Sequence, residues 1–410
     1  MKKREGRASR RAVLGGIAGT LGASALVSAI RPLKAAPSGQ PVRIGSTLAL
    51  TGPLAQTSLI HKAVGEIYVE LTNKKNGFLG RPVEWILLDD QSKPDVARSL
   101  YEKLITVDKV DLILGPYATG NILAAMGVAQ RYQKILIQHT FGLPHLAKYE
   151  MQFPASPIGP EPPKSAPIPI FDLLAASKTP PKTIAIVASK FPSTHFIGQG
   201  ARAEAEKRKI KEVLYLDYEF GTRDFGAIAA RVKDANADFL YCADIGVEPV
   251  QLLDALKKIG YTPPRHYHLF SAPGPLMNSA EGNLALAYTY FEEHPPFTTR
   301  PGAAELIPLY HDKAKALGIP YPFFDFQAAA SATAWQMLEA AITGTNSLDD
   351  KKMAAWLKAN EVKAIIGDLR FDGPNNHGPD QSKVKQVIDK KWVVVWPTEY
   401  APPGVKAMLP

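Results

Sequence analysis

The stretch Leu112-Ile113-Leu114-Gly115-Pro116-Tyr117-Ala118-Thr119-Gly120 decides the fold of this chain. A short apolar strand runs into a turn of small, hydroxyl-bearing and glycine residues, and a helical pattern follows. Two neighbouring stretches repeat the arrangement: Ile44-Gly45-Ser46-Thr47-Leu48-Ala49-Leu50 before Thr51-Gly52-Pro53, and Ile135-Leu136-Ile137 before Gln138-His139-Thr140-Phe141-Gly142. In an open parallel sheet, ligands bind beyond these carboxyl ends of the strands. Because the turns carry no catalytic triad, the pattern favours binding over chemistry.

The alternation of strands and helices continues along the chain in two sets. The first set predicts one further strand at 83–88, extends the strand quoted above to 111–114, and predicts helices at 59–73, 94–108 and 121–132. The second predicts strands at 183–188, 212–216, 238–242 and 268–270, with helices at 196–208, 225–236 and 248–259. Helices at 303–317, 326–343 and 349–360 and a strand at 391–396 complete the pattern. Such alternation predicts right-handed crossovers and a parallel sheet in each half.

Two lobes are expected from the length, because single hydrophobic cores stop growing at roughly 250–300 residues and this chain has 410. Prolines gather at residues 153–169 among few regular patterns. We interpret this stretch as a connection between the lobes and not as a core element.

The first 36 residues are typical of an export signal. A basic start precedes an uncharged run at 12–30 and small residues at Ala35-Ala36, and Ser9-Arg10-Arg11-Ala12-Val13-Leu14 resembles the twin-arginine export motif. Cleavage near Ala36 and a periplasmic location are expected. The alternative is an uncleaved membrane anchor, since the 19 uncharged residues approach the roughly 20 that cross a bilayer.

Charge and cysteine content exclude several classes of function. Residues 1–36 hold eight Lys/Arg and one Glu, so they carry +7 of the total +9 and the remainder carries only +2. A net charge of +2 is too small to indicate nucleic-acid binding. The single cysteine, Cys242, lies in an apolar run and is expected to be a buried core residue, because a nucleophile needs a neighbouring base.

Three patterns that could carry chemistry have simpler explanations. Residues 198–203 match a relaxed dinucleotide-binding fingerprint, but they lie inside a predicted helix, so helix packing is the better interpretation. His266 and His268 share a strand face, yet two ligands are too few for a metal site. Asp89 and Asp90 point to opposite faces of a strand, which favours capping and solvation over acid–base work. We therefore expect no enzyme activity, no cofactor and no metal.

The order of these pieces resembles the periplasmic solute-binding proteins of ABC importers of the branched-chain amino-acid type. The resemblance covers nearly the whole chain from residue 42 to residue 396. It rests on Leu50-Thr51-Gly52-Pro53-Leu54-Ala55, Leu88-Asp89-Asp90 with Pro94, Leu114-Gly115-Pro116, Ile184-Ala185-Ile186-Val187, Asp224-Phe225 and Gly367-Asp368-Leu369-Arg370-Phe371-Asp372.

The resemblance implies a type I periplasmic binding protein fold, in which two Rossmann-like lobes with parallel sheets flanked by helices are joined by three crossovers. The crossovers would fall near residues 153–157, 288–291 and 367–371. Lobe 1 would comprise residues 41–155 and 290–368, and lobe 2 residues 156–289 and 369–410. The lobes would close over a small ligand by hinge bending, and the closed protein, a monomer, would meet a permease in the cytoplasmic membrane.

The resemblance also implies a ligand site. The family's carboxylate-holding serine falls on Thr119, whereas its threonine that contacts carboxylate and ammonium falls on Gly142. Its acidic ammonium partner falls on Pro273, although a shifted alignment would restore an acid such as Asp244 or Glu281. Other wall positions fall on Thr57, Phe196 and Ile245.

The free amide groups at the start of the predicted helix, in Tyr117-Ala118-Thr119-Gly120, suit a carboxylate. Thr140, Phe141 and Gly142 add hydroxyl, aromatic and backbone groups at the neighbouring strand end. The site thus keeps groups that can hold a carboxylate (the anion seat) but lacks an acid that could pair with an ammonium group (the amine seat). We therefore predict a hydrophobic or aromatic carboxylate as the ligand. It would be held by Thr119, Thr140 and nearby amides, with Tyr117, Phe141 and Phe196 as apolar walls. The predicted function is the solute-binding component of an ABC importer for such an acid or for an amino acid. A ligand-sensing subunit on the same fold is the alternative.

Overall fold

The computed structural model describes residues 36–409. The export signal predicted for residues 1–36 therefore falls outside the described residues, apart from Ala36. Among residues 36–409, no helix combines the length and the apolar character that crossing a membrane requires.

The first sheet is parallel throughout and comes from one continuous stretch of chain. Its strand order is β2-β1-β3-β4-β5, and the bounds are β1 Val42–Leu48, β2 Val83–Asp89, β3 Leu112–Leu114, β4 Leu136–Gln138 and β5 Gln152–Pro154. Strands β1, β3 and β4 are buried almost completely, as expected for a sheet covered on both faces.

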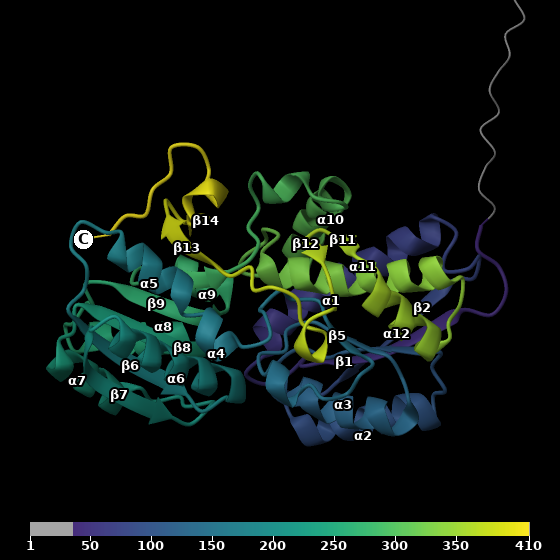
Figure 1. Ribbon diagram of the computed structural model, residues 1–410, viewed down its shortest axis with the longest axis horizontal. Coiled ribbons are helices and arrows are strands. Elements are labelled where there is room, and N and C mark those ends of the chain that lie inside the picture. The colour runs from purple at the N-terminus through teal and green to yellow at the C-terminus, as the bar shows by residue number, and fades with distance from the viewer. Residues whose placement is uncertain (1–35, 410) are drawn as a thin grey trace, which may run out of the picture. The chain divides into compact units, whose positions relative to one another are not determined.

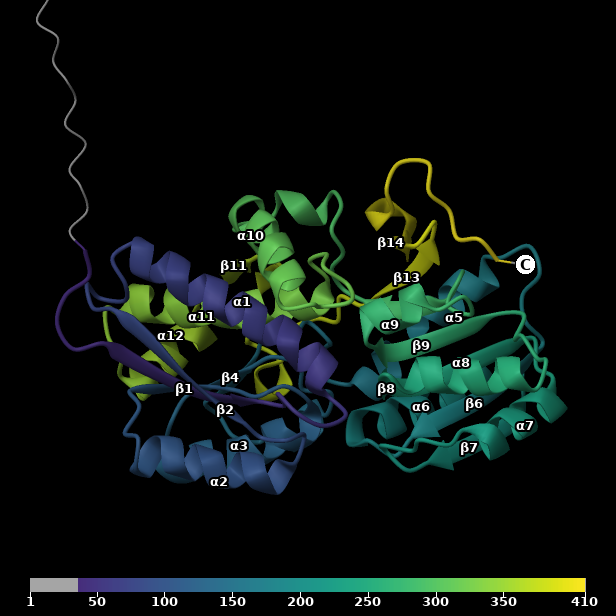
Figure 2. The same ribbon diagram turned by 180° about the vertical axis from the view of Figure 1, so that it is seen from behind.

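The helices of this half cover both faces of the first sheet (Figures 1 and 2). Helices α2 (Pro94–Thr106) and α3 (Thr119–Tyr132) pack on one face, and α1 (Ala55–Lys74) and α11 (Phe326–Thr345) pack on the other. Helices α10 (Ala303–Ala316) and α12 (Asp350–Ala359) flank α1 and α11. Because α11 is surrounded by protein, 14 of its 20 residues are buried, including the polar residues Ser331 and Thr333 in its middle.

The second sheet has a parallel core with an antiparallel edge. Its order is β14-β13-β10-β9-β8-β6-β7, where strands β6 to β10 run parallel and β13 and β14 run antiparallel. The bounds are β6 Thr183–Ser189, β7 Lys211–Tyr218, β8 Phe239–Gly246, β9 His266–Ser271, β10 Leu286–Thr289, β13 Lys383–Ile388 and β14 Lys391–Trp396. The helices around it are α5 Ile168–Ala175, α6 Pro192–Lys207, α7 Gly226–Ala235, α8 Glu248–Lys258 and α9 Pro273–Asn278.

The chain passes between the neighbourhoods of the two sheets three times: after β5, after β10, and between β12 (Gly367–Leu369) and β13. Strand β12 pairs with β11 (Val362–Ala364) beside α11. Two α/β halves with parallel sheets, flanking helices and three crossovers confirm the predicted fold class. Strand β14 lies where a strand was predicted, but strand β13 and its antiparallel pairing with β10 and β14 were not predicted from the sequence.

Two local expectations need correction. The proline-rich stretch at 153–169 is not only a connection, because β5, α4 (Pro162–Ser165) and the start of α5 lie in it. Pro162 and Pro163 open a helix, where a missing N–H costs nothing. Asp89 and Asp90 do not cap a helix: Asp89 accepts from the amides of the loop residues Leu50 and Gln91, and Asp90 accepts from the Thr47 hydroxyl in β1 and from the Ser92 amide. Asp90 is fully buried and not solvated.

Two packing expectations are confirmed. Gly198 lies inside α6, and a Cβ there would come within 3.0 Å of the Ala243 Cβ and 3.1 Å of the Ala188 Cβ. This glycine therefore serves close helix–sheet packing. Cys242 is fully buried, and burial raises the pKa of its thiol well above the usual value.

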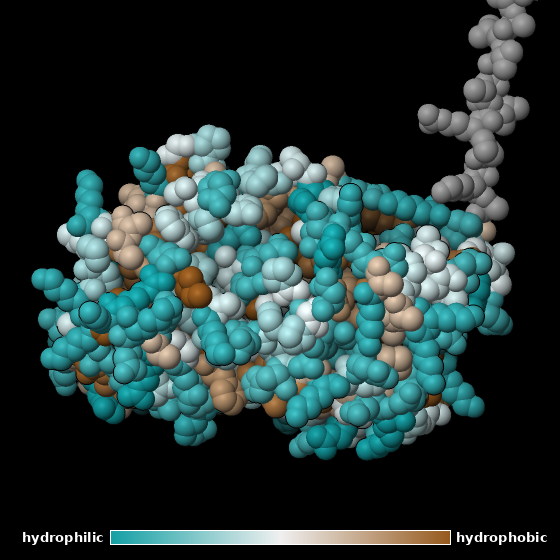
Figure 3. Space-filling model, viewed as in Figure 1, coloured by the Kyte–Doolittle hydropathy of each residue, from teal (hydrophilic) through white to brown (hydrophobic). Residues whose placement is uncertain are grey.

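The surface carries few large apolar side chains. The face in Figure 3 is mostly hydrophilic, with apolar residues scattered over it. Seven large hydrophobic side chains of the described residues are exposed, from distant parts of the chain. Scattered residues of this kind are ordinary for a globular protein.

Candidate functional site

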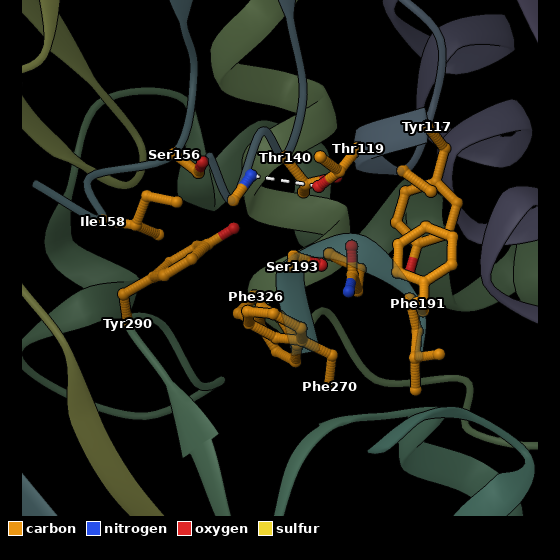
Figure 4. A pocket seen from close by; sticks show the side chains of 14 residues that line it. Tyr117, Thr119, Thr140, Ser156, Ile158, Phe191, Ser193, Phe270, Tyr290 and Phe326 are labelled. Atoms are coloured by element: carbon orange, nitrogen blue, oxygen red, sulfur yellow. Dashed lines mark hydrogen bonds between the residues drawn. The ribbon is translucent and has the colours of Figure 1, made fainter. Parts of the chain in front are cut away.

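A cavity lies where strand ends of both sheets meet (Figure 4). The space in it is about 380 Å³ with its open mouth included, and only about 30 Å³ can hold the centre of a water molecule. The site is therefore narrow in this arrangement. It is lined by Tyr117, Ala118, Thr119, Thr140, Gly142, Ser156, Ile158, Phe191, Ser193, Ile245, Phe270, Tyr290, Phe326 and Gln327.

The fold explains how distant residues meet here. The turns after β3, β4 and β5 bring Tyr117, Thr140 and Ser156 to the carboxyl edge of the first sheet. The ends of β6, β8 and β9 bring Phe191, Ile245 and Phe270 from the second sheet, while α11 contributes its first two residues. This is the position at which an open α/β sheet binds ligands.

One side of the cavity offers hydroxyl groups at a helix N-terminus. Thr119 is the first residue of α3, and its Oγ1 accepts a hydrogen bond of 3.1 Å from the Gly142 amide. Since the hydroxyl accepts from that amide, its own proton remains available to a ligand. The nearby Thr140 Oγ1 is buried without a hydrogen-bond partner. Together with the positive end of α3, these groups suit an anion.

The backbone before α3 is strained. Ala118 has φ +73° and ψ 144°, a conformation that residues with a Cβ rarely adopt. Such strain costs on the order of 1–3 kcal/mol and concentrates at ligand sites. It sets the direction in which α3 leaves the sheet, and thereby the position of the Thr119 hydroxyl.

Aromatic rings form most of the remaining wall. Tyr117 and Phe191 lie on one side in Figure 4, with Phe270 and Phe326 below. Rings behind them fix their positions: Phe220 lies 4.9 Å from Phe191 and Tyr288 lies 5.3 Å from Phe270, between ring centroids. A flat apolar group fits between such rings.

A buried neutral network supports Gln327 from behind. His61 Nε2 lies 3.1 Å from Gln327 Oε1, and the His61 ring contacts Tyr117 and His139. Burial lowers the pKa of both imidazoles, that of His139 to about 4, so neither is charged near neutral pH. The network orients the Gln327 amide without adding charge.

Charged groups stand behind the wall and not in it. Lys385 Nζ lies 2.6 Å from Glu292 Oε1 and 4.8 Å from the centroid of the Phe326 ring. Asp325 caps α11 by accepting hydrogen bonds of 3.1 Å from the amides of Gln327 and Ala328. Among the described residues that line the cavity, no side chain is formally charged.

The structure brings six of the predicted site residues into the cavity lining: Tyr117, Ala118, Thr119, Thr140, Gly142 and Ile245. Thr57 stands behind the wall, where it is buried in α1 and contributes a hydrogen bond to Tyr117. Phe141 is fully buried in the main hydrophobic core, on the opposite side of the chain from its two neighbours that face the cavity.

The other predicted residues lie away from the lining. Phe196 is 39% exposed on α6 and contacts His145, because α6 begins at Pro192, four residues earlier than predicted. Pro273 is buried at the start of α9, where its carbonyl oxygen accepts from the Trp392 indole. Glu281 pairs with Lys257 at 2.5 Å and is not part of the lining.

Asp244 belongs to a buried hydrogen-bonded chain in the second sheet. Its Oδ2 lies 2.6 Å from His268 Nδ1, and His268 Nε2 lies 2.9 Å from His266 Nδ1. Burial raises the pKa of Asp244 and lowers that of His268 to about 3, so the neutral forms are favoured. Cys242, Asp244 and His268 lie close enough together that they could hold a metal ion, a grouping that their spacing in the sequence did not reveal. Neutral hydrogen bonding within the sheet core accounts for Asp244 and both histidines.

Eight lining residues were missed by the sequence: Ser156, Ile158, Phe191, Ser193, Phe270, Tyr290, Phe326 and Gln327. Phe191 and Ser193 follow β6, so the strand-end rule could have found them. Ser156 and Tyr290 follow β5 and β10 in the connecting segments, where no periodicity shows the direction of a side chain.

The family model for periplasmic binding proteins matches residues 41–391. The chain belongs to this family. A leucine-, isoleucine-, valine-, threonine- and alanine-binding protein of Pseudomonas aeruginosa is 24% identical over 340 residues, which are 81% of this chain and 86% of the relative.

Solved structures show the same fold for periplasmic binding proteins. A leucine-binding protein of Thermotoga maritima superposes with a TM-score of 0.72 at 19% identity, covering 86% of this chain and 97% of its own. A solute-binding protein of an ABC transporter from R. palustris, in complex with benzoate, superposes with a TM-score of 0.72 at 17% identity, covering 86% and 95%. At these identities the likeness concerns the fold.

Proposed function

We propose that this periplasmic binding protein captures a hydrophobic or aromatic carboxylate and delivers it to an ABC permease. The observation that carries the proposal is the chemistry of the cavity lining, which combines unpartnered hydroxyls and aromatic rings and, among the described residues, has no charged side chain. Hydroxyls and amides can hold a carboxylate, whereas an ammonium group would have no acid to pair with.

Among the residues that the structure describes, the cavity lining has no acidic side chain that could pair with the ammonium group of an α-amino acid, so an ordinary α-amino acid is a poor ligand for it. The acids nearest in sequence to lining residues are not themselves in the lining: Asp325 accepts from the Gln327 and Ala328 amides through Oδ1, and Asp244 pairs with His268. An ammonium group transferred from water into a closed cavity without a paired carboxylate is strongly disfavoured. The P. aeruginosa relative is named for amino acids and the R. palustris neighbour holds benzoate, and the lining described above favours a cargo of the second kind.

We propose that binding couples to closure of two lobes, residues 41–155 with 290–368 and residues 156–289 with 369–410. The narrow cavity supports this, because a ring-sized ligand needs the walls to separate before it enters. Residues 1–36 would direct export through the twin-arginine route and be removed near Ala36, leaving a periplasmic monomer.

A thermal-shift panel on the mature protein, residues 37–410, tests the proposed cargo. Benzoate, phenylacetate and short alkyl acids are expected to raise the melting temperature, since a ligand that binds only the folded state stabilises it. Leucine and valine at the same concentrations are expected to have little effect. Stabilisation by leucine and valine, with none by aryl or alkyl acids, would overturn the proposal.

A further inference from the structure

Two hydroxyl groups in the cavity have no role in the anion seat. Ser156 is 3% exposed and Tyr290 is 2% exposed, and neither Ser156 Oγ nor the Tyr290 hydroxyl has a hydrogen-bond partner. Both residues line the cavity. Buried polar groups are nearly always paired, so each unpaired one requires an explanation.

Packing holds both groups in place. The Tyr290 ring packs edge-on against Phe326 at 5.3 Å and against Tyr288 at 5.9 Å, between ring centroids. In Figure 4 the Tyr290 ring lies on the same side of the cavity as Ser156, opposite Tyr117 and Phe191, and its hydroxyl points into the cavity. Because burial raises the pKa of Tyr290, its hydroxyl stays protonated and can donate. The two groups therefore present a fixed pair of donors and acceptors.

The chemistry of this pair defines what can satisfy it. Serine and tyrosine hydroxyls each donate one hydrogen bond and can also accept. A neutral oxygen on the ligand can accept from both, and a hydroxyl can also donate to one. No acidic side chain among the described lining residues is present to pair with a cation, and a methyl group or ring edge would leave both hydroxyls without a hydrogen-bond partner, which weakens binding.

We propose that Ser156 and Tyr290 form a second polar seat, which selects carboxylates that also carry a neutral oxygen, as a hydroxyl or a keto group. This inference rests on the proposed function, because it assumes that the acid occupies the same cavity. A site built to hydrogen-bond a ligand oxygen rejects the analogue that lacks it, since its own polar groups are then left unpaired. The seat thus narrows the cargo from hydrophobic acids to oxygenated ones.

Calorimetric titration of matched acids tests the seat. One pair is benzoate with 4-hydroxybenzoate, and the other is 3-phenylpropanoate with phenylpyruvate, so a ring hydroxyl and a 2-keto group are assessed separately. In at least one pair the oxygenated acid is expected to bind about tenfold more tightly than its parent, or better. In Tyr290→Phe and in Ser156→Ala, that ratio is expected to fall toward one.

Control variants separate the seat from a general effect on stability. Tyr310→Phe and Ser58→Ala each remove a buried hydroxyl that also lacks a partner but lies outside the lining. Both are expected to keep the wild-type ratio. Thermal unfolding without ligand is expected to show every variant folded and none destabilised by loss of the hydroxyl, because no hydrogen bond is removed.

The outcomes are distinguishable. If parent acids bind as tightly as oxygenated ones in the wild-type protein, or if the preference survives in both seat variants, the second seat is wrong and the proposed function stands. If none of the four acids binds while leucine does, the proposed function itself fails. If the preference is present in the wild-type protein and both controls and is lost in the seat variants, the seat is established.

Discussion

Gly142 and Ser193 lie directly against each other in the cavity lining, and a Cβ built on Gly142 would lie 2.4 Å from the Ser193 Cβ. Gly142 belongs to the turn after β4 of the first sheet, and Ser193 to the start of α6 beside the second. The residue that the family pattern expects at 142 is a threonine, whose volume is taken here by a serine from the other half of the chain. The size of the side chain that fits at position 142 therefore depends on the residue at position 193.

Gly142→Ala is expected to weaken benzoate binding by roughly 5- to 150-fold, because the added Cβ would overlap Ser193 of the other half and overpacking costs about 1–3 kcal/mol. Calorimetric titration measures the loss. Ser193→Gly in the same protein should restore much of the affinity. Gly127→Ala is the matched control, since a Cβ at this position in α3 meets nothing within 4 Å. Wild-type affinity in Gly142→Ala would show that the two halves do not approach so closely in the bound state.

Thr119→Val is expected to weaken carboxylate binding by about tenfold to a hundredfold. The substitution keeps the shape of the side chain but removes the hydroxyl that accepts from the Gly142 amide and offers its proton to the ligand. Thr119→Ser keeps the hydroxyl and should retain most of the affinity. Equal affinities for the valine and serine variants would remove Thr119 from the anion seat.

Asp325→Asn is expected to change how stability depends on pH. Burial raises the folded-state pKa of Asp325 to about 7, from an ordinary 3.8. Between these values the unfolded chain loses the proton and the folded protein keeps it, so this group makes stability fall as pH rises from about 4 to about 7. The variant should therefore be more stable relative to wild type at pH 8 than at pH 5, in urea unfolding at both pH values. An equal difference at both pH values would contradict the shifted pKa.

Lys385→Met is expected to destabilise the protein by about 3–5 kcal/mol, because it leaves the carboxylate of Glu292 buried and unpaired. Lys385 and Glu292 are 0% exposed, and their charged atoms lie 2.6 Å apart. Adding Glu292→Gln should recover part of the loss. Urea unfolding at pH 7 measures both, and a double variant no more stable than the single one would show that the ion pair does not account for the effect.

The sequence was informative wherever a local rule applies. Strand ends followed by Gly, Thr and Pro located the turns that carry Tyr117, Thr119 and Thr140, because side-chain period and turn chemistry are local properties. Strand β14 was predicted, but its hairpin partner β13 was not, because the two-residue turn between them, Asp389-Lys390, reaches positive φ at both residues without glycine. Strand β13 also contains Lys383, Lys385 and Gln386, buried polar residues that no hydrophobic pattern predicts.

The rest of the site depended on contacts between distant segments. Ser156 and Tyr290 lie in connecting stretches, and only the packing of both sheets decides that their hydroxyls face a common space. The resemblance placed an aromatic wall residue at Phe196, yet the earlier start of α6 gives that role to Phe191. A shift of one helical turn is too small for a single sequence to resolve.

The three crossings also set an order of assembly. Helix α11, which covers one face of the first sheet, is encoded after strands β6 to β10 of the second. Helix α1 can cover its part of that face early, but the part around β4 is covered only after about half of the chain, the residues between β4 and α11, has been synthesised. Contacts so distant in sequence make folding slow, because the loop between them must close first. Partly folded chains with such uncovered strands are prone to aggregation. We therefore expect chains truncated before residue 326 to be insoluble, although they contain every strand of the first sheet.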